Sequence, residues 1–329
     1  MNISSLYNSY PGLYIAQSFA HSFTTALLVD AAIRVWKIED PAVRQKFRLL
    51  IVIFPVLSFP LYQLINPDRG SLSFRLGALF DSSRWMNLEL FPGIQAGLLF
   101  IALLSLTTLL FLSQELVPVV QHALSSRRTE LKGEKPPDDS PVCKALDALS
   151  GPKPEVFLIN DDDLIIFVTT GKNPALYLST GSVEALNGEE LQTAIAHELA
   201  HIERNKRPVL VVAFLLRVLQ FFNIVSLIEF RRIVQEEEII CDDVAVTLTG
   251  NPTALAGTLR KFHPAEDEQA GLPEAALNTR DRMEQYGHSL LIENRIRRLE
   301  TYSAQMHQEE LIPFILTATA VVVINYSIV

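Results

Sequence analysis

Residues 187–201 read N-G-E-E-L-Q-T-A-I-A-H-E-L-A-H and end in an H-E-x-x-H motif. Asn187 is predicted to cap a helix, with Glu190 completing a capping box three residues later. Residues four apart on a helix share one face, so His197 and His201 can bind one zinc ion, and Glu198 can reach the water that the metal activates. A surface helix with two chance histidines is disfavoured by the apolar residues around the motif: Ala194, Ile195, Leu199 and Ile202.

A catalytic zinc site needs a third protein ligand, and the acidic run at residues 236–243 supplies the best candidate. Glu238 and Asp242 lie four apart on a predicted helix, so Glu238 can ligate while Asp242 accepts a hydrogen bond from the outer nitrogen of a ligand histidine. Glu237 is the alternative ligand. Cys241 points about 100° away from Asp242 on a helix, so we expect it not to be a ligand.

Composition restricts the class of protein. Of the 329 residues, 49% are hydrophobic and 20% are charged, with the apolar residues gathered in blocks typical of membrane spans joined to a water-exposed domain. The net charge of -9 argues against a nucleic-acid partner, which would need a basic face. The two cysteines, Cys143 and Cys241, predict neither a disulfide framework nor a cysteine-rich zinc site.

Four apolar blocks are predicted to cross a bilayer, at residues 13–33, 47–65, 93–116 and 312–329. Lys and Arg are concentrated after the first block and after the third, and such residues mark the cytoplasmic side of short loops. We therefore expect three spans within residues 1–117, a cytoplasmic domain at 118–310 and a final span at 311–329, in a multi-pass protein of the cell (inner) membrane. Polar His21 and Asp30 within the first block are expected to face neighbouring helices or the membrane interface.

The apolar stretch at residues 208–230 has the length of a span but cannot be a single crossing. His201 precedes it and Glu238 follows it, and a crossing would separate these two ligands by roughly 30 Å. We expect two helices that meet near Asn223 and form a hairpin facing the membrane. Arg217 argues against deep lipid exposure of its face of the hairpin.

The fold class expected is a mainly α membrane protein with a cytoplasmic α+β domain that contains a small sheet. Strands are predicted at residues 155–159, 164–169 and 175–179, after a charged, proline-rich linker at 133–141. The last strand is expected to lie at a sheet edge and pair with an extended substrate. Its substrate-binding residues would be Ala175, Leu176, Tyr177 and Leu178.

The motif order resembles a known family. H-E-L-x-H at 197–201, Phe221-Phe222-Asn223, and E-x-x-C-D at 238–242 resemble the BlaR/MecR-type antirepressor membrane metallopeptidases, as does G-x-x-P-x-L-x-L-S at 171–179. The resemblance implies a gluzincin fold with a cytoplasmic active site, and regulated cleavage of a cytoplasmic regulator or membrane protein. Ile224 stands where the family usually has proline, and we expect no C-terminal sensor domain after Val329.

A more distant resemblance, to HtpX and CAAX-prenyl proteases, rests on His288 and the segment 293–299. It implies that His288 is the catalytic residue that stabilises the oxyanion, although Tyr286 and His263 remain alternatives.

The sequence thus predicts a zinc metalloendopeptidase that uses Zn2+, acts on a protein or peptide substrate and lies in a lipid bilayer. A non-hydrolytic membrane signal transducer built on the same zinc fold is the alternative, and the intact Glu198 argues against it.

The charge asymmetry of the loops yields a prediction about orientation. Single cysteines at residues 3 and 328 should react with a membrane-impermeant maleimide added to intact cells, whereas a cysteine at residue 135 should react only after the cells are opened. Labelling of residue 135 in intact cells would reverse the orientation.

Overall fold

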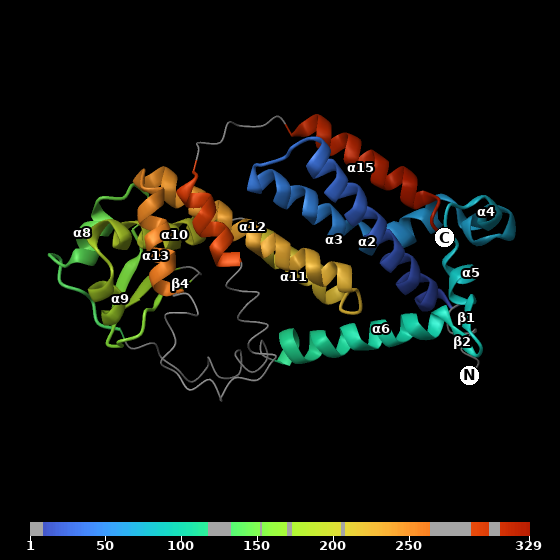
Figure 1. Cartoon of the computed structure of the whole chain (residues 1–329), viewed down its shortest axis with the longest axis horizontal. Helices are drawn as coiled ribbons and strands as arrows, with labels where there is room; N and C mark the ends of the chain where they lie inside the picture. The colour runs from blue at the N-terminus through green and yellow to red at the C-terminus, as the bar shows by residue number, and fades with distance from the viewer. Residues whose placement is uncertain are drawn as a thin grey trace. The chain divides into compact units, whose positions relative to one another are not determined.

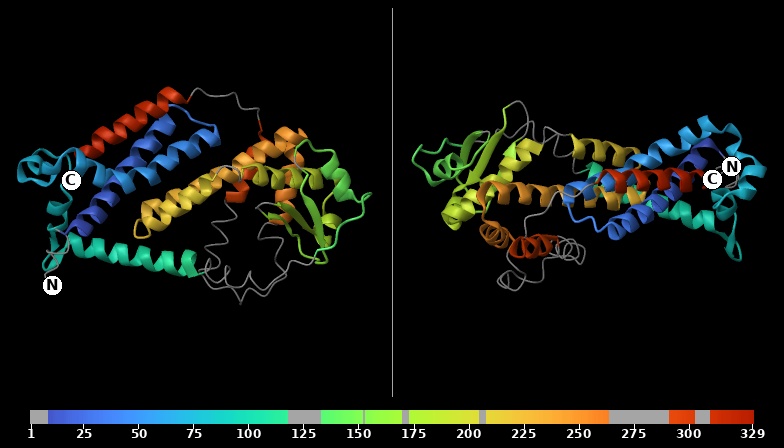
Figure 2. Two further views of the ribbon diagram at one scale, coloured as in Figure 1. Left: turned by 180° about the vertical axis from the view of Figure 1, so that it is seen from behind. Right: turned by 90° about the horizontal axis from the view of Figure 1, so that it is seen from above.

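The computed structural model describes residues 9–117, 133–151, 153–169, 173–204, 208–263, 291–302 and 310–329 (Figures 1 and 2). The chain divides into two compact units. The first consists of Met1–Thr129, Val209–Glu236 and Met306–Val329, and the second of Glu130–Pro208 and Glu237–Gln305. Residues 209–236 thus belong with the N-terminal helices, although they interrupt the second unit in sequence.

Long helices build the first unit: α2 (Tyr10–Val35), α3 (Pro41–Ile65), α6 (Ala96–Phe111), α11 (Val209–Leu219), the start of α12 (Ile224–Thr249), and α15 (Leu311–Tyr326). A π-helical turn, η2 (Leu112–Leu116), continues α6. The connection from α3 to α6 contains η1 (Pro67–Gly70), α4 (Leu72–Gly77), α5 (Ser82–Met86) and the hairpin of β1 (Glu89–Phe91) with β2 (Ile94–Gln95).

Two helices of the described chain are long and apolar enough to cross a bilayer, namely α3 and the segment Ala96–Gln114. α11 and α15 are apolar but shorter, at 11 and 16 residues. α2 has 26 residues, but it buries several polar side chains. Of the four expected spans, the second and third are both long enough and apolar enough to cross a bilayer, and the first and fourth stay predictions.

The polar residues of α2 are satisfied by protein groups. His21 Nδ1 lies 2.6 Å from Ser58 Oγ, and its Nε2 lies 3.2 Å from the carbonyl oxygen of Ile328. Asp30 pairs with Arg48 and Arg232, each at 3.4 Å. These contacts agree with the interpretation that both residues face neighbouring helices.

The stretch 208–230 is folded as two helices, α11 and the first part of α12, with a turn between them. Polar side chains of the turn bind the helices beside it. Gln220 Nε2 donates to the carbonyl of Val52 at 2.7 Å, and Asn223 Nδ2 donates to Ser22 Oγ at 2.6 Å. Buried turn amides are costly unless they are bonded, so these contacts fix the fold-back.

Arg217 of α11 is buried, with its guanidinium 4.9 Å from the ring centre of Phe111. The position of the hairpin relative to a bilayer stays a prediction.

The second unit is built around a three-stranded sheet in the order β3 (Glu155–Ile159), β5 (Ala175–Ser179), β4 (Ile166–Thr169). β3 runs parallel to β5, and β4 runs antiparallel to it. Around the sheet lie α8 (Pro141–Asp147), α9 (Thr180–Ala185), α10 (Gly188–Arg204), the end of α12, α13 (Pro252–Phe262) and the helix of residues 291–300. The three predicted strands are all present.

One expectation about the sheet is wrong. β5 is the central strand, so the backbones of Ala175, Leu176, Tyr177 and Leu178 are paired on both sides and cannot accept a substrate strand. β4 is at an edge instead. Since Ile165 is hydrogen-bonded to Ser179 of β5, the alternate residues Ile166 and Val168 direct their backbone N–H and C=O groups away from β5.

The core of the second unit forms where α10 packs on the sheet. Leu176 and Leu178 of β5 and Ile195 of α10 are fully buried in one cluster. The predicted capping box starts α10: the N–H of Glu190 donates to Asn187 Oδ1 at 3.0 Å, and the N–H of Asn187 donates to Glu190 Oε2 at 2.9 Å. This packing holds the helix that carries the H-E-x-x-H motif.

The turn between α11 and α12 predicts that both flanks of the hairpin lie on one side of the membrane. Cysteines replacing the exposed Pro208 and Arg231 should therefore react from the same side with an impermeant reagent. Reaction from opposite sides would show that the hairpin crosses the membrane.

Candidate metal centre

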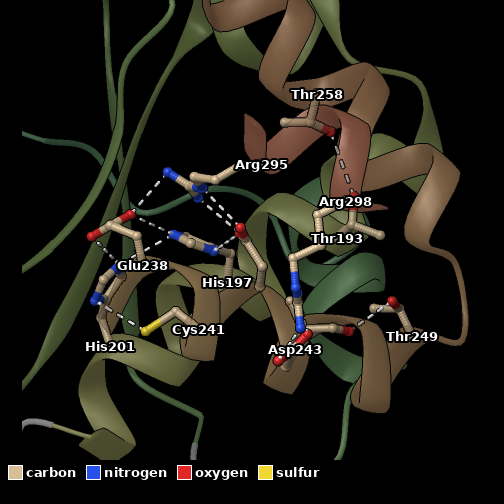
Figure 3. Close-up of polar contacts among 12 residues, drawn as sticks. Thr193, His197, His201, Glu238, Cys241, Asp243, Thr249, Thr258, Arg295 and Arg298 are labelled. Carbon is tan, nitrogen blue, oxygen red and sulfur yellow. Dashed lines mark hydrogen bonds and ion pairs between the residues drawn. The ribbon is translucent and has the colours of Figure 1, made fainter. Parts of the chain in front are cut away.

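Three side chains converge on one point in the second unit (Figure 3). His197 Nε2 lies 3.1 Å from His201 Nε2. Oxygens of Glu238 lie 3.6 Å from each of these nitrogens. The predicted ligands are therefore brought together, with donor atoms from α10 and α12.

The spacing of the donors fits zinc. Two ligand atoms at tetrahedral angles, each about 2.0–2.1 Å from zinc, are roughly 3.3–3.4 Å apart. The two histidine nitrogens are 3.1 Å apart, and each lies 3.6 Å from one of the two oxygens of Glu238, so the distances are close to that value. Two imidazoles and one carboxylate are also a ligand set that leaves a fourth position open, as in catalytic zinc sites.

Asp242 holds His197 from behind. Its Oδ1 lies 3.0 Å from His197 Nδ1, the nitrogen that faces away from the other two donors. Burial disfavours the charged form of His197, but Asp242 and Glu238 outweigh it and raise the pKa of this metal-free imidazole to about 9. A carboxylate at Nδ1 keeps the proton there and leaves Nε2 free to ligate. The contact fits the role predicted for Asp242, which stays a prediction.

Arg295 is the residue that sequence reasoning missed. Its Nε and Nη2 donate to the two oxygens of Asp242 at 2.8 and 2.7 Å, and its Nη1 lies 3.1 Å from Glu238 Oε2. Burial opposes ionisation of Asp242, but hydrogen bonds from Arg295 and His197 hold its pKa below the ordinary value. Arg295 thus positions two acidic groups of the site.

The helix of residues 291–300 carries Arg295 and is fixed in two ways. Ile292, Ile296 and Leu299 are buried in the core cluster. Arg298 makes a bidentate pair with Asp243, at 2.6 and 2.8 Å. In the sequence, the feature that pointed to Arg295 was the R-I-x-x-L segment that begins with it. That segment did not show that Arg295 would bind Asp242 and Glu238.

Cys241 is not among the grouped donors, as expected, but it touches the site. Its Sγ lies 3.4 Å from His201 Nδ1, the outer nitrogen of that ligand. Burial raises the pKa of the Cys241 thiol, so the group stays protonated at neutral pH. The thiol therefore contacts the back of His201 rather than the ligand point.

The alternative ligand Glu237 is engaged elsewhere. Arg204 of α10 binds both of its carboxylate oxygens, with Nη2 donating to Oε2 at 2.7 Å. Glu237 is therefore not available at the point where the ligand atoms meet.

Glu198 follows the first histidine on α10 and is half-buried. Burial raises the pKa of its carboxyl to about 7, with smaller opposing effects from His197, which lowers it, and Glu238, which raises it. A hydrogen bond from the backbone N–H of Val168 lowers it slightly. Glu198 thus lies against the edge strand β4.

Of the three residues considered for stabilising the oxyanion, His263 is the one that the structure describes, and it does not join the grouped donors. His288 and Tyr286 lie outside the described residues. His263 is exposed at the end of α13. The oxyanion-stabilising group therefore stays a prediction.

Comparison with known proteins supports the chemistry of this site. Residues 165–254, which include the three grouped donors and Asp242, match the family described as BlaR1 peptidase M56. A protease HtpX homolog of Streptococcus agalactiae serotype Ia is 28% identical over 170 residues, covering 37% of this chain and 57% of the relative. One of Streptococcus equi subsp. zooepidemicus is 26% identical over 171 residues, covering 37% and 58%. One of Pediococcus pentosaceus is 43% identical over 53 residues, covering 16% and 18%.

The matched region thus spans little more than half the length of the streptococcal relatives. Together with the apolar helices, these matches support a membrane metallopeptidase, and hence a protease.

The contact between Asp242 and His197 predicts an effect on metal affinity. Asp242→Asn should weaken zinc binding by about 10- to 100-fold, because outer partners of a ligand histidine contribute on that scale. Competition with a chromogenic chelator measures the affinity. Asp147→Asn, an exposed change on α8, is the matched control, because its carboxylate pairs with Lys153 and not with a residue of the site. Equal affinities for the two variants would contradict the positioning role.

Proposed function

We propose that this chain is an integral-membrane, zinc-dependent endopeptidase in which His197, His201 and Glu238 hold the metal and Glu198 is the general base. The observation that carries the proposal is the convergence of His197, His201 and Glu238 on one point, with the half-buried Glu198 next to His197 on α10. The family match over residues 165–254 supports it.

The chemistry divides between the metal and the protein. Zinc, when bound, acidifies a water molecule and polarises the scissile carbonyl. Glu198 accepts the proton of the attacking water on its carboxylate and passes it to the leaving amine. In the metal-free site, burial raises the pKa of the Glu198 carboxyl, which is the direction that suits a group that must take up a proton. Asp242 and Arg295 keep the ligand groups oriented during this transfer.

The edge strand β4 is the proposed platform for the substrate backbone. On the side away from β5, Ile166 presents its N–H and C=O groups and Val168 its C=O group, while the N–H of Val168 donates to Glu198. An extended peptide that added to this edge would pass the proposed base, since edge strands bind peptides through backbone hydrogen bonds. This platform replaces the one expected on residues 175–178.

The proposed setting is the cytoplasmic side of a cell membrane, where the enzyme would cleave a regulator or a membrane protein. The arginines and lysines that flank the predicted spans support the orientation. A signal transducer that does not hydrolyse peptides needs the zinc fold but not a base. Proteomic comparison of cells that express the wild type or Glu198→Gln separates the two: only a protease leaves uncleaved substrate in the variant.

Metal content and activity should separate the proposed roles. Glu238→Ala should lose zinc because it removes a ligand, whereas Glu198→Gln should keep zinc and lose about 100- to 10,000-fold in kcat because it removes the base. Glu203→Gln, an exposed change on the same helix, is the control and should alter neither property. Elemental analysis and a peptide-cleavage assay are the measurements. Full zinc occupancy in Glu238→Ala would place the third ligand elsewhere.

Substrate pairing with β4 predicts an effect on KM. Ile166→Pro removes an N–H that points away from β5, so the sheet should tolerate it, but KM should rise roughly two- to tenfold through the loss of one hydrogen bond. Zinc content and circular dichroism serve as controls for folding. An unchanged KM would remove β4 from the substrate platform.

A further inference from the structure

A cavity of about 470 Å³ lies within the first unit, among α2, α5 and α6. Its walls are aliphatic and aromatic, and include Ala20, Phe23, Met86, Leu99, Phe100 and Leu103. Small-molecule sites in proteins are commonly 300–1,000 Å³ with apolar linings, so the cavity is large enough for a ligand. It contains none of the proposed catalytic residues.

The walls of the cavity are held by specific contacts. Phe19 and Phe100 meet edge to face at 5.3 Å and join α2 to α6. Ile328, another wall residue, bridges to Phe80, and Ser82 Oγ donates to the carbonyl of Val329 at 2.7 Å. The cavity is thus preformed, as ligand sites usually are.

The lining restricts what can bind. Its only hydroxyl-bearing residues are Thr24 and Ser82, and the Ser82 hydroxyl is already used by Val329. A ligand with several polar groups would lose its hydrogen bonds to water here without replacement. A saturated hydrocarbon chain requires none. One wall of the cavity is formed by α6, which is long and apolar enough to cross a bilayer. The acyl chains of lipids are therefore the hydrocarbon chains that would lie next to the cavity.

An exposed arginine lies next to the lining residue Trp85 on α5. Arg84 is exposed on α5, between the lining residues Ser82 and Trp85, and its guanidinium makes no ion pair with any described residue. The nearby acids are engaged: Asp81 pairs with Arg75, and Glu89 accepts from the N–H of Gly93. Trp85 is 55% exposed, and tryptophan is enriched at the boundary between lipid chains and headgroups.

We propose that this cavity binds one acyl chain of a phospholipid whose phosphate pairs with Arg84. The apolar cavity accounts for the chain and the free guanidinium for the phosphate, which arginine binds through a planar fork of donors. The site does not depend on the protease activity.

Photolabelling of the full chain in nanodiscs tests the proposal. The probe is phosphatidylglycerol with a diazirine on one acyl chain, titrated into phosphatidylcholine, and mass spectrometry locates the labelled residues. Labelling of the lining residues of α5 and α6 should saturate. Ala20→Phe fills the cavity and should abolish this labelling, whereas Ala31→Phe, the same change at an exposed position of α2, should not.

The phosphate contact has its own test. Arg84→Gln, an exposed change that leaves the cavity intact, should raise the half-saturating probe concentration about fivefold. Arg34→Gln, at an exposed position near the other end of α2, is the control and should have no effect. A diacylglycerol probe with the same chain should bind wild type as weakly as phosphatidylglycerol binds Arg84→Gln.

Two results would overturn the proposal. Labelling that rises without saturation, or that persists in a folded Ala20→Phe variant, would mean that only bulk lipid touches this face. Equal binding of phosphatidylglycerol to wild type and Arg84→Gln would remove the phosphate contact.

Discussion

The architecture depends on one requirement: nitrogen atoms from α10 and an oxygen from α12 must meet at a single point. The chain between His201 and Glu238 contains 36 positions, and most of them belong to the first unit, while both of these proposed ligands belong to the second. The chain must therefore leave the second unit and return to it. The turn at residues 220–223, bonded through Gln220 and Asn223, makes that return possible.

Three consecutive glutamates of α12 each contact different partners and together fix the position of that helix. Glu236 pairs with Arg44 at 3.0 Å and Arg48 at 3.5 Å, Glu237 pairs with Arg204, and Glu238 joins the histidines. Successive residues on a helix point about 100° apart, so each carboxylate faces a different neighbour. A buried ion pair adds little to the stability of a protein, but removing one partner destabilises the protein strongly. These pairs therefore fix the rotation of α12 about its own axis more than they add stability.

Asp242 and Arg295 form a second set of charged contacts, which fixes the orientation of His197 and Glu238. Asp242 lies between His197 and Arg295, and Arg295 also reaches Glu238. A buried aspartate this close to a histidine would repel other carboxylates unless a cation compensated it. Arg295 supplies the compensation, which lets two acidic groups lie beside the same imidazole.

The sequence by itself determined the features that depend on local periodicity. The capping box, the histidines four apart on α10, the Glu238–Asp242 pair and the three strands follow from helix and strand repeats, which extend over only a few residues. The grouping of His197, His201 and Glu238 could also be predicted, because one zinc ion requires its ligands to meet.

Only the tertiary structure decided which groups become neighbours across long separations. The sheet has β5 in the centre and β4 at the edge. The alternation of apolar and polar residues within one strand does not show which other strand will pair with it. Arg295 reached Asp242 from 53 residues away, and Arg204 reached Glu237 from 33. The ion-pair partner of a charged residue cannot be identified from the sequence, because it depends on how the helices pack.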